Sequence, residues 1–413
     1  MDPSNALLRS FQTCLDDREA KGHRRRLKVL PSNSVDFSSN DFLSLSTSPG
    51  FRSHFLRELA FASSSYPLGS KGSRLLDGNS TYAEDLECFV ASFHQAESGL
   101  LFNSGYDANL AIFSCIPQPG DIVLYDELIH ASIHDGMRLS RAGKRISFKH
   151  NSVDNFAEVL RKLIDNDPMI LAGERNVFIA VESLYSMDGD FAPIVELLET
   201  LETLLPNGNG HMIVDEAHST GVFGPRGSGI VQELEVQNRV LIRLHTFGKA
   251  LASHGAIVLC SPLTREYLIN YARSLIYTTS LSLSSLVSIR AVYESMDQGI
   301  TDSLRSDLHR LVEYLRTELE ATVQTGDRPV LRLCHHHRSP IFSIQTPFPR
   351  ELASFLQAAG QVVRAIMPPT VAAGTERVRI CLHARNTVKE IDGLVSLIRK
   401  WARQHDDSQA SML

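Results

Sequence analysis

Polar side chains follow short apolar segments at several points in the middle of the sequence, and their types could do chemistry together. In chain order they belong to His130, Glu182, Ser186, Asp215, His218, Thr246 and Lys249. A lysine amine shielded from water forms an imine with an aldehyde near neutral pH. An aspartate at the end of an apolar strand is costly to bury unless a cation meets it. The combination indicates covalent amine chemistry beside a cationic ring.

Asp215 ends the apolar run 212–214 and begins the tetrapeptide Asp-Glu-Ala-His. A carboxylate within hydrogen-bonding distance raises the pKa of a ring nitrogen by roughly 1–3 units, about 1.4–4 kcal/mol, which keeps a pyridine protonated at neutral pH. A protonated ring withdraws electrons from the carbon bonded to it through an imine. The alternative interpretation is structural, with Asp215 capping the next helix and His218 as a turn residue.

The letters Asp-Glu-Ala-His also form the acidic box of helicases, a different class of protein. A helicase needs a phosphate loop of the pattern Gly-x-x-x-x-Gly-Lys-Ser/Thr. The sequence lacks that pattern, and Lys249 is followed by Ala250 where a hydroxyl residue would hold magnesium. The sequence therefore argues against a helicase.

Lys249 ends the tetrapeptide Thr-Phe-Gly-Lys, which follows a predicted strand from Val240 to Leu244. An ordinary surface lysine is the alternative, because exposed lysines are common. The stretch 244–256 is weakly charged, however, and Thr246 offers a hydroxyl three residues before the amine. We therefore expect Thr246 to bind a phosphate and Lys249 to bond an aldehyde.

Short apolar runs bounded by polar turns predict the strands that position these residues. The runs are 99–102, 122–125, 177–181, 212–214, 240–242 and 256–259. Runs without polar alternation, separated by helical stretches such as 82–93, are typical of a mostly parallel sheet covered on both faces. An α/β fold follows, and ligands of such sheets bind beyond the carboxyl ends of the strands.

The pattern changes after Ser280, where a leucine stripe predicts a long helix before short strands at 342–344, 362–366 and 378–381 and a closing helix at 388–401. We predict an N-terminal segment (1–36) that packs on a small domain, a large domain (37–285), a small C-terminal α/β domain (286–404) and a tail (405–413).

Composition excludes several classes of protein. A formal net charge of -6 argues against nucleic acid as a partner. The cysteines form no CxxC pair, which argues against a disulfide framework or a metal site. No apolar run is long enough to span a membrane. Ser411-Met412-Leu413 approximates the Ser-Lys-Leu peroxisomal address, so the expected compartment is the peroxisome or, failing that, the cytoplasm.

A family resemblance covers about 37–386. Its ordered blocks are Phe37-Ser38-Ser39-Asn40-Asp41-Phe42-Leu43, Gly69-Ser70-Lys71-Gly72-Ser73-Arg74, Asn103-Ser104-Gly105-Tyr106-Asp107-Ala108-Asn109, His130-Ala131-Ser132, Ser186-Met187-Asp188-Gly189-Asp190, Asp215-Glu216-Ala217-His218, Thr246-Phe247-Gly248-Lys249 and Pro368-Pro369-Thr370-Val371. They resemble the α-oxoamine synthase group of fold-type I pyridoxal-phosphate enzymes. The resemblance implies a large domain with a mostly parallel seven-stranded sheet and a smaller C-terminal α/β domain.

The resemblance implies a role in cofactor binding or catalysis for ten residues. Lys249 would bond the cofactor and later carry a proton, Asp215 would pair with the pyridine nitrogen, and His130 would stack on the ring. Hydrogen bonds near the phenolic oxygen would come from Ser186 and His218. The phosphate or cofactor edge would be lined by Gly105, Tyr106 and Thr246, and by Thr278 and Thr279 of the neighbouring subunit. A homodimer with active sites at its interface is therefore implied.

Substrate-binding residues are implied as well. Arg379 matches an arginine that grips the substrate carboxylate, a bidentate geometry that lysine cannot reproduce, and its alternative is a charge on a strand surface. Asn40 and Thr370 lie in matching blocks. Arg24 stands where a substrate-contacting arginine is expected, although a one-residue gap leaves Arg25 equally open.

The implied reaction condenses an amino acid with an acyl-CoA and releases coenzyme A and carbon dioxide. Within the group the resemblance is strongest to the biotin-pathway branch, which implies alanine and pimeloyl-CoA. Met367 departs from that pattern, because arginine is common there, so another acyl chain or amino acid stays an alternative. A catalytically inactive partner subunit is a second alternative, although Lys249, Asp215 and His130 are all present.

Overall fold

The computed structural model describes residues 5–27, 29, 31, 33–323 and 330–410. The chain forms two compact units, 1–35 and 36–413. The first contains helix α1 (Ala6–Ala20), whose N-cap residue Asn5 accepts hydrogen bonds from the backbone N–H groups of Leu7 and Leu8. No side chain of α1 is buried. Strand β1 (Val35–Asp36) spans the point where the units meet in sequence.

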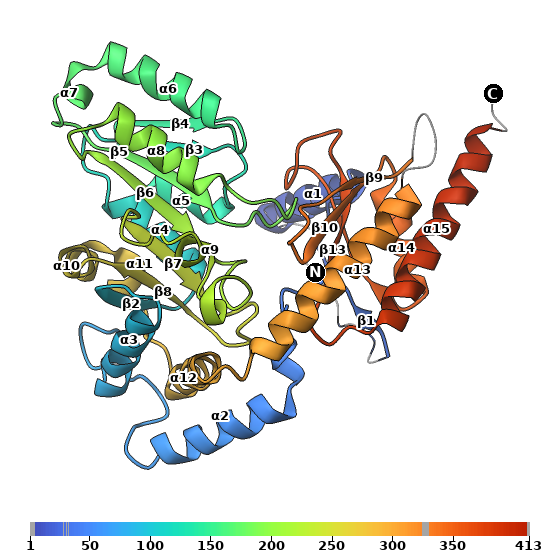
Figure 1. The fold of residues 1–413 in the computed structure, drawn as a ribbon, viewed down its shortest axis with the longest axis horizontal. Coiled ribbons are helices and arrows are strands. Elements are labelled where there is room, and N and C mark those ends of the chain that lie inside the picture. The colour runs from blue at the N-terminus through green and yellow to red at the C-terminus, as the bar shows by residue number, and fades with distance from the viewer. Residues whose placement is uncertain (1–4, 28, 30, 32, 324–329, 411–413) are drawn as a thin grey trace. The chain divides into compact units, whose positions relative to one another are not determined.

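The second unit is built around a seven-stranded sheet with strand order β2-β8-β7-β6-β5-β3-β4 (Figure 1). Its strands are β2 (Ser98–Phe102), β3 (Ile122–Asp126), β4 (Lys144–Phe148), β5 (Val177–Glu182), β6 (Gly210–Asp215), β7 (Ile242–Thr246) and β8 (Ala256–Cys260). Only β8 runs against the other six. The predicted α/β class and the mostly parallel seven-stranded sheet are confirmed.

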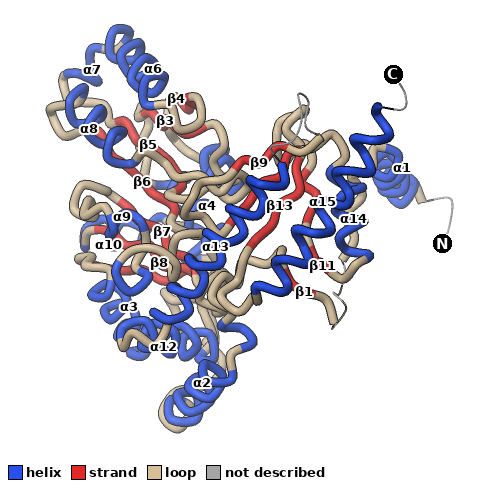
Figure 2. Tube along the Cα trace, turned by 45° about the vertical axis from the view of Figure 1, so that its right-hand side comes forward, coloured by secondary structure: helices blue, strands red, loops and turns tan. Residues whose placement is uncertain are grey.

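Helices cover both faces of this sheet, as the blue segments on either side of the red strands show in Figure 2. The helical elements of the second unit up to this point in the chain are α2 (Pro49–Ala62), α3 (Thr81–Phe93), α4 (Gly105–Cys115), α5 (Ala131–Arg138), α6 (Val153–Asn166), α7 (Pro168–Leu171), α8 (Ile194–Leu204), α9 (Ile230–Glu233), α10 (Pro262–Tyr271), α11 (Arg273–Ile276) and α12 (Leu283–Asp297), with 3-10 turns η1 (Leu45–Thr47) and η2 (Pro225–Gly227).

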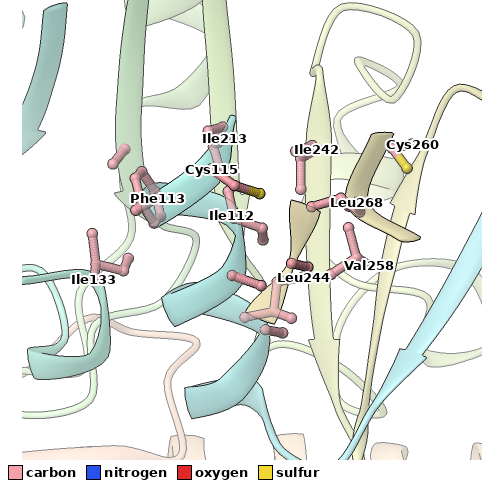
Figure 3. Close-up of a cluster of buried hydrophobic side chains, with 14 of the residues drawn as sticks. Ile112, Phe113, Cys115, Ile133, Ile213, Ile242, Leu244, Val258, Cys260 and Leu268 are labelled. Carbon is pink, nitrogen blue, oxygen red and sulfur yellow. The ribbon is translucent and has the colours of Figure 1, made fainter. Parts of the chain in front are cut away.

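The core that fixes α4 to the sheet is apolar. Its buried side chains include Ile112 and Phe113 of α4, Ile133 of α5, and Ile213, Ile242, Leu244 and Val258 of the strands, and Figure 3 shows them filling one layer. Burying side chains of this size contributes about 1.5–3 kcal/mol each. The layer therefore holds the N-terminus of α4 close to the end of β7.

A four-stranded antiparallel sheet follows, in the order β12-β13-β10-β9. The elements after α12 are α13 (Asp302–Val323), β9 (Arg332–Cys334), β10 (Ile341–Gln345), α14 (Pro349–Ala358), β11 (Gln361–Val362), β12 (Arg364–Ile366), β13 (Arg377–Cys381) and α15 (Val388–Ala410). The predicted domain boundaries stay predictions. Among the described residues, no helix combines the length and apolarity that crossing a bilayer requires.

Four details of the sequence prediction are wrong. β4 was not predicted, because Lys144, Arg145 and Ser147 give this edge strand an exposed, polar pattern. β7 runs from Ile242 to Thr246 instead of beginning at Val240. The predicted strand 362–366 is divided into two strands at Val363, whose carbonyl accepts a hydrogen bond from Gln357 Nε2 at 2.7 Å. Finally, α15 continues past its predicted end at 401.

Candidate active site

The candidate active site lies at the carboxyl edge of the large sheet. The neighbouring strands β3, β5, β6 and β7 run parallel, so they end at the same edge. Their last residues are Asp126, Glu182, Asp215 and Thr246. The predicted His130, Ser186, His218 and Lys249 follow within four residues or fewer. This is the edge at which open parallel sheets bind ligands.

Asp215 presents a buried carboxylate at the end of β6, with 7% of the residue exposed. Its Oδ2 accepts a hydrogen bond from Asn109 Nδ2 at 2.7 Å, and its Oδ1 accepts one from the backbone N–H of Ala217 at 2.9 Å. Glu182 lies beside it in register on β5. Burial, and then the charge of Asp215, raise the pKa of Glu182 well above its ordinary value. Burial thus favours the protonated form of Glu182, and Asp215 is the carboxylate that would meet a cationic ring nitrogen.

Lys249 lies in the turn between the antiparallel strands β7 and β8. The turn is fixed by Phe247, whose ring is fully buried and whose N–H donates to the carbonyl of Gly255 at 2.9 Å. Burial lowers the pKa of the Lys249 amine to about 8, against the opposing attraction of Asp215 and Glu182. A neutral, nucleophilic amine is thus well populated near neutral pH.

A chain of hydrogen bonds joins His130 to Asp215. His130 Nδ1 lies 2.7 Å from Ser132 Oγ, and Asn109 Nδ2 donates both to Ser132 Oγ at 3.0 Å and to Asp215 Oδ2. His130 is exposed at the sheet edge, where its ring is available to a stacked ligand. The sequence prediction gave Asn109 and Ser132 no role. Their positions in the sequence could have indicated a role in the site, because Asn109 stands one helical turn after Gly105 and Ser132 follows His130 closely.

Arg379 of β13 brings two other predicted residues together. Its Nε donates to the carbonyl of Ser186 at 2.6 Å, and its Nη2 donates to Asn40 Oδ1 at 2.9 Å. The loop that carries Ser186 requires glycine at position 189, since φ is +72° and a Cβ there would lie 2.3 Å from the carbonyl oxygen of Ile341. The rigid loop and the fork of the guanidinium form a place for a carboxylate.

His218 is buried beside these groups, and its Nδ1 has no hydrogen-bond partner among the described residues. Burial, followed by the charges of Lys249 and Arg379, holds the pKa of His218 well below its ordinary value. The imidazole is therefore neutral and can bind a polar atom of a ligand. A buried polar atom without a partner is costly, so this position favours an occupant with a donor or acceptor.

The N-terminus of α4 meets the end of β7 at the same edge. Ser104 caps α4 by accepting from the N–H of Asp107 at 3.0 Å. A Cβ on Gly105 would lie 3.5 Å from Thr246 Cβ, which places Thr246 next to the first turn of the helix. The ring of Tyr106 contacts that of His130 edge-on, with centroids 6.4 Å apart. A helix N-terminus with adjacent N–H groups and a threonine hydroxyl suits a phosphate.

These residues fit the predicted pyridoxal phosphate. The buried carboxylate of Asp215 matches the ring nitrogen, and the unpartnered nitrogen of His218 matches the ring oxygen. The amine of Lys249 matches the aldehyde, and the N-terminus of α4 matches the phosphate. Within the described ranges, no group of three or more His, Cys, Asp or Glu side chains could hold a metal ion.

Asn103 connects Thr278 and Thr279 to the carboxyl edge of the large sheet. Asn103 Nδ2 donates to Thr278 Oγ1 at 3.2 Å and to the carbonyl of Thr279 at 2.7 Å. Asn103 precedes the cap of α4, so both threonines stand near the segment that leads to Gly105. Whether they serve this site or a neighbouring one stays a prediction.

Two predicted substrate residues are not joined to the site by any of these contacts. Thr370 is exposed, and its N–H donates to the carbonyl of Met367 at 3.0 Å. Arg24 belongs to the N-terminal unit, where its Nε lies 3.5 Å from a carboxylate oxygen of Glu19. Their roles stay predictions.

Comparison with known proteins agrees with the fold and the family resemblance. The model of the family "aminotransferase class I and II" matches residues 32–398. An 8-amino-7-oxononanoate synthase of Emericella nidulans is 59% identical over 411 residues, covering 100% of both chains. Aminoacyl transferase sphA of Aspergillus fumigatus is 40% identical over 388 residues, which cover 91% of this chain and 82% of that protein.

Solved structures give the same result. An 8-amino-7-oxononanoate synthase from Francisella tularensis superposes with a TM-score of 0.72 and 27% identity, covering 91% of this chain and 99% of that one. A serine palmitoyltransferase of Sphingomonas wittichii, 24% identical, shares the fold with a TM-score of 0.83 over 97% of this chain and 99% of that one. The resemblance to α-oxoamine synthases is confirmed, and the chain belongs to the aminotransferase class I and II family.

Proposed function

We propose that this protein is a pyridoxal-phosphate enzyme of biotin biosynthesis that condenses L-alanine with pimeloyl-CoA, giving 8-amino-7-oxononanoate, coenzyme A and carbon dioxide. The observation that carries the proposal is the 59% identity to the Emericella nidulans synthase over the full chain. The convergence of Lys249, Asp215 and Arg379 on one sheet edge supports it from the geometry.

Bound pyridoxal phosphate supplies a conjugated ring that stabilises negative charge on the substrate α-carbon. Asp215 holds the proton on the ring nitrogen and so keeps that ring cationic. Lys249 would hold the cofactor through its amine. The same amine, once free and beside the substrate, would accept the α-proton and later return one.

Arg379 orients the amino acid. Its guanidinium already donates to Ser186 and Asn40, so its direction is fixed before the substrate arrives. A carboxylate on its free donors would be held in the surroundings of Lys249, whose pKa is lowered by burial and also by the Arg379 charge, and His130 would stack on the ring. Fixing the geometry in advance reduces the entropy cost of reaching the reactive arrangement.

A synthase that uses another acyl chain is the second candidate function. Met367 offers no cation where the biotin-pathway branch commonly has arginine, and the similarity to aminoacyl transferase sphA fits this alternative. Thr370 and Arg24, or Arg25 in its place, are the residues we expect to contact the acyl chain.

A substrate panel tests the proposed function. Purified protein loaded with cofactor is given alanine, glycine or serine, each with pimeloyl-CoA or a long-chain acyl-CoA, and coenzyme A release is measured. We expect alanine with pimeloyl-CoA to give a kcat/KM at least about 10-fold above every other pair, as small side-chain differences in a pocket allow. Release with a different pair alone would favour the second candidate function.

The pH dependence of cofactor capture follows from Lys249. Only the neutral amine attacks the aldehyde, so the capture rate of cofactor-free protein should rise with pH and level off above about 8. An ordinary lysine amine would make the rate climb about tenfold per pH unit to above pH 10. Stopped-flow absorbance between pH 6 and 10 measures this, with a free lysine derivative as the reference. A rate still climbing at pH 10 would contradict the lowered pKa.

The proposed assembly is a homodimer in which Thr278 and Thr279 reach the partner's phosphate site. Their exposure supports this, since Thr279 is exposed and Thr278 only half-buried.

The proposed compartment is the peroxisome, on the evidence of the last three residues, which lie outside the described ranges; the cytoplasm is the alternative. A fluorescent reporter that ends in residues 405–413 would distinguish the two compartments.

A further inference from the structure

His150 is held between two carboxylates that belong to different segments. Its Nδ1 lies 2.8 Å from Asp126 Oδ1, and its Nε2 lies 2.6 Å from Asp190 Oδ2. Carboxylate oxygens accept hydrogen bonds, so these two contacts call for a donor on each ring nitrogen, and Asn151 Nδ2, 3.2 Å from Nε2, donates to Asp190 Oδ2 at 2.8 Å. Only the imidazolium form of histidine carries a proton on each nitrogen. The arrangement is therefore a positive ring fixed between two negative groups.

Asp126 fixes the turn that leads to His130. The carboxylate is fully buried at the end of β3 and accepts from the N–H of Leu128 at 2.9 Å as well as from His150. Its backbone carbonyl accepts from the N–H of Ile129 at 3.1 Å. The turn thus ends at His130 with its direction set by Asp126.

Asp190 fixes the loop that carries Ser186. Its backbone carbonyl accepts from the N–H of Tyr185 at 2.9 Å, and the Tyr185 ring meets the His150 ring edge-on at 4.5 Å between centroids. The carbonyl of Ser186, between these points, accepts from Arg379. The direction of the arginine therefore depends on this loop.

We propose that His150, as an imidazolium between Asp126 and Asp190, is a positioning residue that ties the turn carrying His130 to the loop carrying Ser186. This deepens the proposed function and rests on it, since one tied segment bears the ring-stacking histidine and the other orients the carboxylate-binding arginine. His150 acts through these residues and does not itself contact substrate.

The surrounding charges support an imidazolium. Although burial lowers the pKa of His150, hydrogen bonds to Asp126 and Asp190, and then their charges, raise it to about 10. The other titratable or charged groups that act on this cluster are Asp188, which pairs with Arg377, Glu127, which accepts from the N–H of His150, and Tyr185. Glu182 also feels the charge of Asp126, and His336 and Cys334 feel that of Asp190. Because the folded pKa exceeds the ordinary 6.5, the stabilisation is complete below about pH 6.5 and is lost as pH rises through about 10.

The test is hydrogen exchange of the cofactor-bound His150→Gln variant, because glutamine is neutral and offers one side-chain nitrogen in place of the two ring nitrogens of His150. Amide exchange in 127–132 and in 185–191 should both accelerate about 10-fold or more, as loss of a charged hydrogen bond allows, while β6 stays protected. The KM for alanine should rise with a smaller change in kcat. His211→Gln is the matched control, since His211 also makes a side-chain hydrogen bond, at 3.1 Å, but at the opposite end of β6.

Acceleration in one segment only, or in neither, would overturn the proposal. Should His150→Gln not fold, Asp190→Asn replaces the more exposed partner, and the loop 185–191 alone must then exchange faster. The exchange readout is independent of which substrates react. If the proposed reaction fails but both segments exchange faster in His150→Gln, the positioning role of His150 is retained. If the reaction proceeds but the segments do not exchange faster, only the positioning role is removed.

Discussion

The Lys249→Ala variant should keep its fold and lose both the visible absorbance of the bound cofactor and nearly all turnover. Removing the amine removes the covalent bond to the aldehyde and the group that moves the α-proton, so we expect kcat to fall by about 10³-fold or more. Absorbance spectra, bleaching by borohydride and coenzyme A release measure the two losses. Lys144→Ala is the matched control, because Lys144 is exposed on the edge strand β4.

A yellow, active Lys249→Ala variant would contradict the assignment of the lysine. A wild-type protein that folds but stays colourless with added cofactor would instead favour the inactive partner subunit. The two outcomes differ in which protein lacks colour, so a single spectrum of each separates them.

The same variant tests the shared site. In a heterodimer of Lys249→Ala with a Thr278→Ala/Thr279→Ala chain, one active site would combine the intact lysine of one chain with the intact threonines of the other. If Thr278 and Thr279 hold the partner's phosphate, the double threonine variant alone should also have little activity, and mixing the two proteins under exchange conditions should restore part of it. A site built within one chain would restore none.

The sequence predicted the sheet well where burial is purely apolar. β8 and the part of β5 from Val177 to Val181 are fully buried runs of apolar residues, and both were found. β7 was displaced because it is fully buried yet contains Arg243 and His245. Arg243 makes this possible by donating to the carbonyl of His94 at 2.9 Å, a contact between distant segments that no local pattern records.

The site was predictable in its strand-end residues but not in the contacts between them. Lys249 and Asp215 were singled out because each follows an apolar strand, and the family resemblance singled out Arg379. The hydrogen bond from Asn109 to Asp215 joins residues 106 positions apart, and it arises only when α4 packs on the sheet. Such contacts depend on tertiary geometry, so their prediction needs the fold first.

The Asp215→Asn variant should bind the cofactor and fold normally but turn over far more slowly. Asparagine has the same shape and can still accept from Ala217, yet it no longer stabilises a proton on the ring nitrogen. Losing roughly 1–3 units of ring-nitrogen pKa, about 1.4–4 kcal/mol, predicts a fall in kcat of about 10- to 1000-fold. Steady-state coenzyme A release at saturating substrates measures it, with a melting curve to verify the fold.

Glu182→Gln is the control that distinguishes the effect of the Asp215 charge on kcat from the effect of replacing a buried carboxyl with an amide. Glu182 lies in register beside Asp215, and burial followed by the charge of Asp215 raises its pKa well above the ordinary value, which favours its neutral, protonated form. Replacing a neutral carboxyl with an amide should change kcat by less than about threefold, a cost under ~0.7 kcal/mol. Equal losses in both variants would mean that the position needs a well-packed polar group and that the negative charge of Asp215 is not what drives the chemistry.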